Sequence, residues 1–461
     1  MSKQRPNILL LFTDQQRYDA LGAMGNPHIR TPNLDELASR GALFSKTYCN
    51  SPVCMPSRQS MMTGRYPAET GCTANGIEMR DDMPTLAHML AEHGYHTANF
   101  GKLHFTNHAT RDHSAPHPHF GFDELELSDE PGCYDDAYIQ WVTDHDPDAV
   151  EACRCAPPPA VSQTSDRPPR ALHHPYVFEG PEHLTHSAFV ADRTIEFIKR
   201  RKTNAEPFFA VAGFYAPHCP LNPPKWFVRM YDPDTLPAPV MNEGENILGL
   251  TTEQWRRVKQ FYYALISHVD DQVGKILKAL DDAGLRERTV VIFTSDHGEH
   301  LGDHGLVAKG PPGYEPVLRV PLIVDDPGTP GGIVRNELIE LVDVAPTILD
   351  CAEVPVPDGL SGRSLRPLLT QSPHMQWRES IYSEHREPGG KSWKMMRTHR
   401  YKYAVCSDGQ ELLFDLDEDP HELNNRAGND EDEALAGRMR RMLIDRWINT
   451  EAPPRHKTGP Y

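Results

Sequence analysis

The stretch Asn7-Ile8-Leu9-Leu10-Leu11-Phe12-Thr13, followed at once by Asp14-Gln15, is the segment of this chain that best indicates its fold. A short continuous apolar run of this kind is typical of a strand that is buried on both faces of a parallel sheet. A second such run, Thr289-Val290-Val291-Ile292-Phe293-Thr294, leads into Asp296-His297. The two runs predict two buried strands, each with polar residues at its carboxyl end.

Helical patterns lie between and around these strands. Apolar residues step by three or four from Trp255 to Leu280, which predicts a helix from about Thr252 to Ala283 with a capping box between Thr251 and Gln254. Further helices are expected over residues 32–44, 85–93, 187–201 and 431–448, and further strands over 96–100 and 207–214. Strands alternating with helices predict an α/β fold with a doubly wound, parallel or mixed sheet flanked by helices.

The last part of the chain has a different character. Residues 393–398, 401–405 and 411–415 are short alternating segments separated by turns, which predicts a small antiparallel sheet. We therefore expect a main α/β domain over residues 1–382 and a small C-terminal α+β subdomain over residues 383–461. The segment from about 128 to 182 is rich in Pro, Asp and His, and we expect it to be an irregular insertion near the rim of a site.

Composition limits the classes of function. The chain has 461 residues, 38% of them hydrophobic, and a formal net charge of −18, which argues against a nucleic-acid-binding protein. It does not argue against an anionic ligand, because the local field of a cleft matters more than the sum. Nine cysteines, an odd number in a long chain, do not indicate a disulfide framework. The sequence offers no signal peptide or membrane-spanning run, so we expect a cytoplasmic protein without membrane partners.

A distinctive motif lies between the two strands: Cys54-Met55-Pro56-Ser57-Arg58, followed by Thr63-Gly64-Arg65. A lone Cys54 would most simply be a small buried hydrophobic residue. The combined pattern resembles the type I sulfatases of the alkaline-phosphatase-like superfamily, whose motif cysteine is oxidised to Cα-formylglycine by a formylglycine-generating maturation enzyme. The resemblance implies the alkaline-phosphatase-like fold and an aldehyde hydrate at position 54, in which one hydroxyl attacks and the other expels the product.

The polar residues at the two strand ends suggest a metal site. If the strands are neighbours, Asp14, Gln15, Asp296 and His297 meet at one sheet edge and offer ligands for a hard divalent cation. A lone aspartate would more often cap a helix or form a turn, but two pairs at two strand ends favour a metal. The resemblance assigns these four residues to one ion, Ca²⁺ first, with Mn²⁺ or Mg²⁺ as alternatives. Gln15 stands where the commoner family pattern has a second aspartate, which is similar to the branch of choline sulfatases and phosphonate monoester hydrolases.

Cationic residues follow other predicted strands. The segments that match the family are Gly101-Lys102-Leu103-His104, Tyr215-Ala216-Pro217-His218 and the stretch 303–310, which contains Lys309. Taken singly, these lysines would more often be solvated surface residues. A sulfate ester needs several cations and hydrogen-bond donors directed at one point, and this requirement favours the functional interpretation.

The resemblance also implies roles for the catalytic residues. Arg58 would hold the formylglycine hydrate and Lys102 would support it. His104 would take the proton that leaves the hydrate when the sulfated intermediate collapses. His218 and Lys309 would bind the sulfate and assist the leaving oxygen. Other histidines, most of them expected at the surface or rim, are His113, His117, His119, His173, His174, His300 and His304.

These observations predict an enzyme, a sulfatase that cleaves a small anionic ester: an aryl or alkyl sulfate or a sulfated sugar. A first alternative keeps the fold but acts on a phosphonate monoester or phosphodiester. Gln15 and His297 permit that alternative, whereas Ser57 and the Gly101–His104 element argue against it. A second alternative is an inactive binding protein in which Cys54 is never converted. The sequence is compatible with a homo-oligomer and does not identify the substrate.

Overall fold

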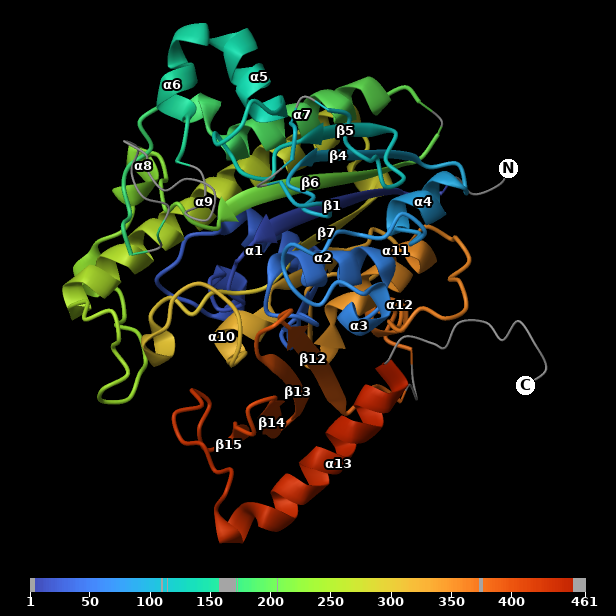
Figure 1. Ribbon diagram of the computed structural model, residues 1–461. Helices are drawn as coiled ribbons and strands as arrows, with labels where there is room; N and C mark the ends of the chain where they lie inside the picture. Colours follow the sequence, from blue (N-terminus) through green and yellow to red (C-terminus); the bar gives the residue numbers. More distant parts are fainter. Residues whose placement is uncertain are drawn as a thin grey trace.

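The computed structural model describes residues 5–108, 111–113, 115–156, 171, 173–204, 206–372 and 376–450. Within these ranges, eight strands form a central sheet in the order β10-β2-β9-β7-β1-β6-β4-β5 (Figure 1). The strands from β7 to β5 run parallel, while β9 is antiparallel to β7 and to β2. The sheet is therefore mixed, as predicted. Its strands are β1 (Asn7–Asp14), β2 (Ala42–Phe44), β4 (His96–Gly101), β5 (Glu124–Leu127), β6 (Phe208–Pro217), β7 (Thr289–Ser295), β9 (Leu322–Asp325) and β10 (Ile333–Arg335).

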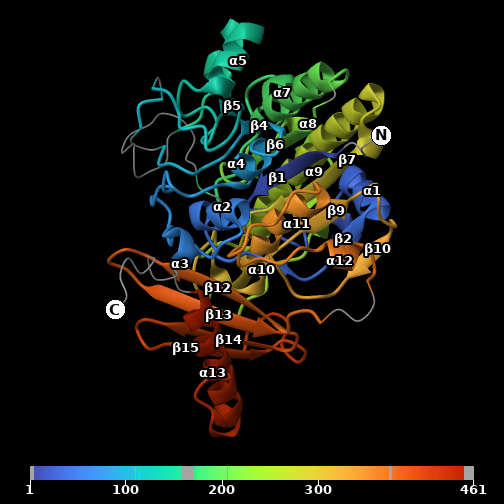
Figure 2. The same ribbon diagram turned by 90° about the vertical axis from the view of Figure 1, so that its right-hand side faces the viewer.

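Helices cover both faces of this sheet, and β1 shows why its sequence is uniformly apolar. Leu9 and Leu11 belong to one buried cluster with residues of α1, α7 and α9, whereas Ile8 and Leu10 belong to a second with residues of α2, α4 and α11. Alternate residues of one strand thus fill two cores. Figures 1 and 2 show these helices on the two sides of the sheet. Their bounds are α1 (Pro32–Arg40), α2 (Cys54–Thr63), α4 (Leu86–Ala91), α7 (His186–Arg201), α9 (Thr252–Ala283) and α11 (Val344–Cys351).

The long helix α9 has the bounds that the sequence predicts. The side chain of Thr251 accepts a hydrogen bond from the backbone N–H of Gln254, and both halves of the expected capping box are present. Gly284 ends the helix with a left-handed backbone, φ 68°. Because both ends carry strong local signals, the boundaries could be read from the sequence.

One predicted helix was too long. A single helix over 32–44 was expected, but α1 ends at Arg40 and residues 42–44 form strand β2. Gly41 lies between them, where a Cβ atom would stand 2.4 Å from the carbonyl oxygen of Val324. The backbone of β9 therefore approaches this point so closely that the helix cannot continue through it.

The insertion over 128–182 is not wholly irregular, in contrast to the prediction. It contains α5 (Ala137–His145) and the short helix α6 (Val150–Cys153). Asp136 caps α5, with its side chain accepting hydrogen bonds from the backbone N–H groups of Tyr138 and Ile139. Residues 157–170 and 172 of this segment lie outside the described residues.

The C-terminal region forms an antiparallel sheet in the order β12-β13-β14-β15, packed against helix α13. Alternate residues face different cores: Met395 joins the core of the main sheet, while Met396 packs with Met439 of α13. Strand β12 had no counterpart among the predicted strands, and the predicted division between residues 382 and 383 falls inside it. The bounds are β12 (Ser380–Arg386), β13 (Ser392–Thr398), β14 (Tyr401–Cys406), β15 (Glu411–Asp415) and α13 (Glu433–Thr450).

The remaining elements are short. They include a small sheet in the order β11-β3-β8. Their bounds are β3 (Thr47–Tyr48), β8 (Arg319–Val320), β11 (Ile339–Glu340), α3 (Pro67–Thr70), α8 (Lys225–Val228), α10 (Glu315–Leu318) and α12 (Arg366–Leu369).

Two expectations concern the chain as a whole. Within the described residues the nine cysteines form no disulfide bond with one another. In the ranges that the structure describes, no helix combines the length and the apolar character needed to cross a membrane. The predicted cytoplasmic location remains a prediction.

Candidate active site

The carboxyl ends of β1 and β7 lie side by side because the two strands are parallel neighbours. Asp14 and Asp296 come from these ends, and α2 brings Cys54 to the same point. Asp14, Cys54, Asp296 and His297 each offer one ligand atom, and these four atoms lie within 4.8 Å of one another. All four side chains are buried. The convergence of the two strand ends, which the sequence predicted only conditionally, is thus observed.

His297 has the hydrogen-bonding pattern of a metal ligand. Its Nδ1 lies 2.8 Å from the carbonyl oxygen of Gly298, which assigns the ring proton to Nδ1. The lone pair of Nε2 then faces the cluster, 3.2 Å from Sγ of Cys54 and 3.8 Å from Oδ1 of Asp14. Burial lowers the pKa of His297, which favours the neutral imidazole that a cation requires.

Gln15 contributes an unsatisfied acceptor beside this cluster. Its backbone N–H donates to Oδ1 of Asp296 at 3.0 Å, and its side-chain nitrogen donates to Glu299. Its buried side-chain oxygen has no hydrogen-bond partner among the described residues. A buried amide oxygen without a donor is unfavourable unless a cation or a water satisfies it. The donor set of two carboxylates, one amide oxygen and one imidazole therefore fits a hard divalent cation.

Cys54 is the first residue of α2 and is 1% exposed. Its Sγ lies 2.5 Å from Nζ of Lys309 and 3.7 Å from Oδ1 of Asp14. Burial, followed by the charge of Asp14, raises the pKa of the Cys54 thiol to about 12, although Lys309 acts in the opposite direction. Reactive cysteines have a lowered pKa, because the thiolate is the nucleophile. The unmodified thiol is therefore unsuited to attack at neutral pH.

Arg58 and Lys102 are buried cations, not surface residues. Nε of Arg58 donates to Oδ2 of Asp296 at 2.7 Å, and its Nη2 donates to Oδ2 of Asp14 at 3.1 Å. Nζ of Lys102 lies 2.8 Å from the same Asp14 oxygen. Arg58 and Lys102 thus form ion pairs with the two aspartates, whereas the resemblance implied that they would contact the group at position 54. The three cations of the site, with Lys309 as the third, exceed the two carboxylates by one charge.

Two glycines allow Lys102 to leave the sheet at this position. Gly101 has φ 93°, and a Cβ there would stand 2.2 Å from the carbonyl oxygen of Gly213 on β6. A Cβ on Gly213 would stand 2.3 Å from the carbonyl oxygen of Lys102. The close approach of the two backbones at the ends of β4 and β6 therefore requires glycine on both strands.

His104 lies in a tight turn next to Lys102. It has φ 60°, and its backbone N–H and that of Leu103 both donate to Oδ1 of Asp129 at 2.9 Å. Burial and then the charge of Lys102 lower the pKa of His104 well below its usual range. The ring is therefore neutral near pH 7 and can accept a proton.

His218 follows β6 at the edge of a small cavity of 60 Å³. Its Nδ1 donates to the carbonyl oxygen of Cys219 at 2.8 Å, and burial followed by Lys309 lowers its pKa. Residues of the insertion line this cavity as well, which agrees with its expected place near the site. Those insertion residues are Pro131, Tyr138, Cys153, Cys155 and Phe178.

Several buried residues at the site had not been singled out from the sequence. Glu299 holds Gln15, Asp129 fixes the turn at His104, and Glu130 contacts His108 and Tyr215. Glu299 lies two residues after His297, and this proximity was the only available signal. Asp129 and Glu130 follow β5, which was not among the predicted strands, so the sequence carried no signal for them. In addition, His300 and His304, which were expected at the surface or rim, are buried.

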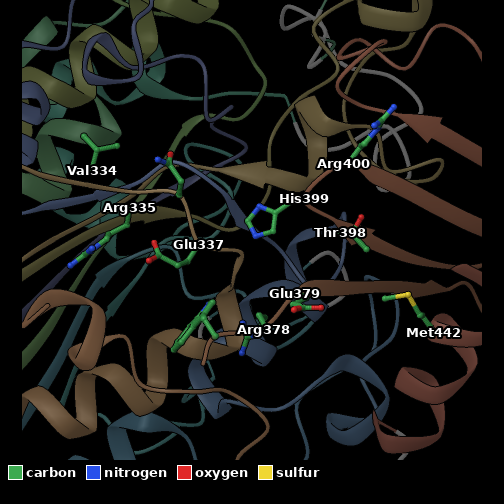
Figure 3. Close-up of a pocket in the computed structure, with 11 residues that line it drawn as sticks. Val334, Arg335, Glu337, Arg378, Glu379, Thr398, His399, Arg400 and Met442 are labelled. Carbon is green, nitrogen blue, oxygen red and sulfur yellow. The ribbon is translucent and has the colours of Figure 1, made fainter. Parts of the chain in front are cut away.

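A much larger cavity, of 780 Å³, lies away from these residues (Figure 3). Its lining comes from β10 and the loop after it, from the segment before β12, from the turn between β13 and β14, and from Met442 of α13. None of the predicted site residues lines it. Size alone therefore does not identify the active site of this protein.

Comparison with known proteins gives consistent matches. A family model described as Sulfatase matches residues 6–354, and one described as N-sulphoglucosamine sulphohydrolase, C-terminal, matches residues 302–448. An arylsulfatase from Clostridium perfringens is 32% identical over 95% of this chain and 94% of its own length. A choline-sulfatase from Rhizobium meliloti is 28% identical over 97% of this chain and 88% of its own length. The first model spans every predicted site residue, from Asp14 to Lys309.

A solved structure has a closely similar fold. The crystal structure of a phosphonate monoester hydrolase from Agrobacterium radiobacter superposes with a TM-score of 0.84 at 26% identity, covering 97% of this chain and 96% of the other. The fold of this chain, with its central sheet, flanking helices and small C-terminal sheet, is thus shared with a phosphonate monoester hydrolase.

Proposed function

Since this chain belongs to the sulfatase family, we propose that it hydrolyses a sulfate monoester by means of formylglycine at position 54 and one divalent cation held by Asp14, Gln15, Asp296 and His297. Ca²⁺ is the first choice of ion and Mn²⁺ or Mg²⁺ the second. The ester is an aryl or alkyl sulfate or a sulfated sugar. Conversion of Cys54 requires a formylglycine-generating maturation enzyme as a partner.

One observation supports this proposal above the others. The side chain of Cys54 is buried between Lys309 and the carboxylate–imidazole cluster, and its thiol has a raised pKa. A protonated thiol in this position has no obvious chemical use, whereas a different nucleophile attached to the same Cβ would stand at the centre of the site.

The two groups that the protein would acquire have distinct uses. Formylglycine supplies a geminal diol as nucleophile, and the cation supplies positive charge that binds the ester oxygens and lowers the pKa of a bound hydroxyl. The chain's own residues would do the rest. Arg58 and Lys102 keep Asp14 ionised, since burial alone would raise the pKa of Asp14 and these cations, with Lys309, lower it well below its usual range.

Binding and proton transfer would be divided among the remaining residues. Lys309 lies beside position 54, where it neutralises charge on the sulfuryl oxygens. His104, neutral near pH 7, takes up a proton from the hydroxyl at position 54. His218, on the side of the small cavity, would bind the sulfate and assist the leaving oxygen together with Lys309. His104 is buried, whereas Lys309 and His218 are partly buried, and this burial limits the access of bulk water and strengthens their electrostatic interactions.

A phosphonate monoester or phosphodiester is the second candidate substrate. The similarity to the phosphonate monoester hydrolase supports it, as does Gln15. Against it stands the Gly101–His104 element. Ser57, whose hydroxyl donates to the backbone carbonyl of Asp296 at 2.5 Å, likewise follows the sulfatase form of the motif.

The test combines mass spectrometry with a substrate screen. Trypsin releases residues 47–58 as one peptide, which contains both Cys49 and Cys54. In protein from the native host, or co-expressed with a formylglycine-generating enzyme, we expect an aldehyde or hydrate at 54 and an alkylatable thiol at 49. Converted protein should hydrolyse sulfate monoesters faster than phosphonate monoesters or phosphodiesters. A thiol at 54 in host-purified protein would sink the mechanism, and a preference for phosphonates would favour the second candidate.

A further inference from the structure

A buried carboxylate, that of Glu130, lies between the segment that carries His104 and the segment that carries His218. Glu130 follows β5, is 7% exposed, and belongs to the start of the insertion. Its Oε1 lies 2.9 Å from Nε2 of His108, and its Oε2 lies 3.2 Å from the hydroxyl of Tyr215. His108 comes from the loop after β4 and Tyr215 from the end of β6. One carboxylate thus joins segments that are separated by β5 and the insertion along the chain.

Each partner of Glu130 touches a predicted catalytic residue. The ring of His108 packs against the ring of His104, with centroids 4.6 Å apart. The ring of Tyr215 lies 4.6 Å from Nζ of Lys102 and 4.8 Å, between centroids, from the ring of His218. The contacts of Glu130 therefore lead to both sides of the site.

Tyr215 and His218 are also linked through a shared acceptor. The Tyr215 hydroxyl lies 2.7 Å from the carbonyl oxygen of Cys219, and Nδ1 of His218 lies 2.8 Å from the same oxygen. The hydroxyl proton is thus shared between Glu130 and Cys219. A shift of Tyr215 would disturb both the ring contact and the hydrogen bond that orient His218.

We propose that Glu130 is a positioning residue that fixes His104, through His108, and Lys102 and His218, through Tyr215, in one catalytic arrangement. The proposal rests on the function proposed above.

A carboxylate is suited to this bridge for a physical reason. Both of its oxygens accept hydrogen bonds, so it can satisfy two donors that approach from different segments. A glutamine of the same shape has one accepting oxygen, and its amide nitrogen would face one of the two donors. Glu130 also acts to raise the pKa of His104 and of His218, against the larger lowering by burial and neighbouring lysines.

Asp129, the preceding residue, supports the same arrangement by a separate route. Its Oδ1 accepts the backbone N–H groups of Leu103 and His104, so it fixes the backbone of the turn. Glu130 instead holds His108, whose ring packs on the ring of His104. Because proton transfer depends steeply on distance and angle, a small displacement of either ring should slow turnover strongly.

The test compares Glu130→Gln with a matched control, Glu126→Gln. Glu126 lies on β5 and accepts hydrogen bonds from Arg193 at 2.7 and 2.8 Å, outside this network. In protein with confirmed conversion at position 54, using the sulfate monoester that the wild type hydrolyses fastest, we expect Glu130→Gln to lower kcat between about tenfold and a hundredfold. KM should stay within about threefold, because the residues of the bridge are not expected to contact the leaving group. Glu126→Gln should keep the wild-type kcat.

A double variant shows whether the effect passes through His108. If it does, Glu130→Gln combined with His108→Ala should be little worse than the more damaging single variant, because both remove the same support. The proposal would be overturned if the loss of kcat in the double variant equalled the product of the losses in the two single variants. A kcat of Glu130→Gln within about twofold of wild type would overturn it as well. Should Glu130→Gln fail to fold, Tyr215→Phe removes one arm of the bridge while keeping the ring over Lys102. The same loss in kcat with KM retained is then expected.

The failure of this proposal can be distinguished from the failure of the proposed function. A wild-type protein that is converted at position 54 but hydrolyses no sulfate monoester contradicts the function. Crystal structures of the wild type and Glu130→Gln then decide the positioning role. Displaced or disordered rings of His104 and His218 would support it, and an unchanged arrangement would overturn it.

Discussion

The side-chain nitrogen of Gln15 donates a hydrogen bond to Glu299, and this contact leaves the buried amide oxygen of Gln15 without a donor. An aspartate at position 15 would instead place a second carboxylate against Glu299, and two adjacent buried carboxylates repel each other. Gln15, which stands in place of the commoner aspartate, therefore has a matching acceptor in Glu299, two residues after His297. Gln15 and Glu299 form a pair in which the glutamate orients the glutamine.

Removal of the metal should abolish turnover and lower thermal stability. The candidate ligands carry buried charges and an unsatisfied oxygen, so the apo site is electrostatically unfavourable. Chelator-treated protein should regain activity with Ca²⁺, or with Mn²⁺ or Mg²⁺, and its Tm should rise with the ion concentration. Full activity after exhaustive chelation, verified by elemental analysis, would refute a catalytic metal.

Glu299→Gln should weaken binding of the ion without unfolding the protein. A glutamine at 299 no longer dictates which way the amide of Gln15 points, and we expect Kd to rise by about tenfold. Isothermal titration of Ca²⁺ into chelated protein measures the change. Glu384→Gln is the matched control, since Glu384 is equally buried but pairs with Lys394 in the C-terminal sheet. Equal affinities for the two variants would contradict the role of Glu299.

Cys54→Ala should lower kcat/KM by at least about a thousandfold, because alanine has no thiol that can be oxidised to formylglycine and so supplies no nucleophile. Cys49→Ala is the control: Cys49 is also buried and lies in the same tryptic peptide, and its thiol donates to the backbone carbonyl of Val317. It should cost stability but retain activity. Activity of Cys54→Ala near that of the wild type would exclude a nucleophile at position 54.

Lys309→Met should reduce kcat by about a hundredfold to a thousandfold, as expected for loss of one preorganised charge at the reacting group. The Nζ atom of Lys309 lies beside Sγ of Cys54, and the side chain is only 14% exposed. Lys278→Met, on the exposed face of α9, provides a comparison with little expected effect. Steady-state kinetics on converted protein distinguishes the two, and a mere rise in KM for Lys309→Met would point to binding alone.

Asp270 gives the fold a predictable pH dependence. It lies on α9, 2% exposed, and accepts the backbone N–H groups of Asn33 and Leu34 at the start of α1. Burial raises its pKa from 3.8 to about 6. Between these values the folded state binds more protons than the unfolded state, so stability falls as pH rises, and above pH 6 the loss is complete.

Urea unfolding at several pH values tests this expectation. The difference in unfolding free energy between wild type and Asp270→Asn should decrease by about 2–3 kcal/mol from pH 4 to pH 7, because asparagine does not titrate. Asp281→Asn, at an exposed position of the same helix, should show no such trend. A constant difference for Asp270→Asn would show that the carboxyl titrates normally in the folded protein.

The parts of the fold that could be predicted are those with strong local signals. Helix α9 has a capping box at Thr251 and a glycine at 284, and its observed bounds agree with the predicted range of about Thr252 to Ala283. Strand β1 was recognisable because both of its faces are buried. Strands β2 and β12 were missed, since a three-residue strand after Gly41 and a strand beginning at Ser380 have little local pattern to distinguish them.

The same distinction applies to the candidate site. Residues carried by motifs, such as Cys54 and Lys102, could be named from the sequence. Glu130 could not, because its significance depends on His108 and Tyr215, which are brought to it by separate strands. Residues that support other residues act through tertiary contacts, and a single sequence contains no record of those contacts.

The burial of Cys54 also bears on the order of events during biosynthesis. With 1% of its surface exposed at the start of a fully buried helix, this side chain is out of reach of any other enzyme once α2 has packed. The oxidation of Cys54 that we propose would therefore have to precede folding, while this segment is still accessible. Protein that folds with a thiol at this position would stay unconverted for its lifetime, and mixing it later with a maturation enzyme would not repair it.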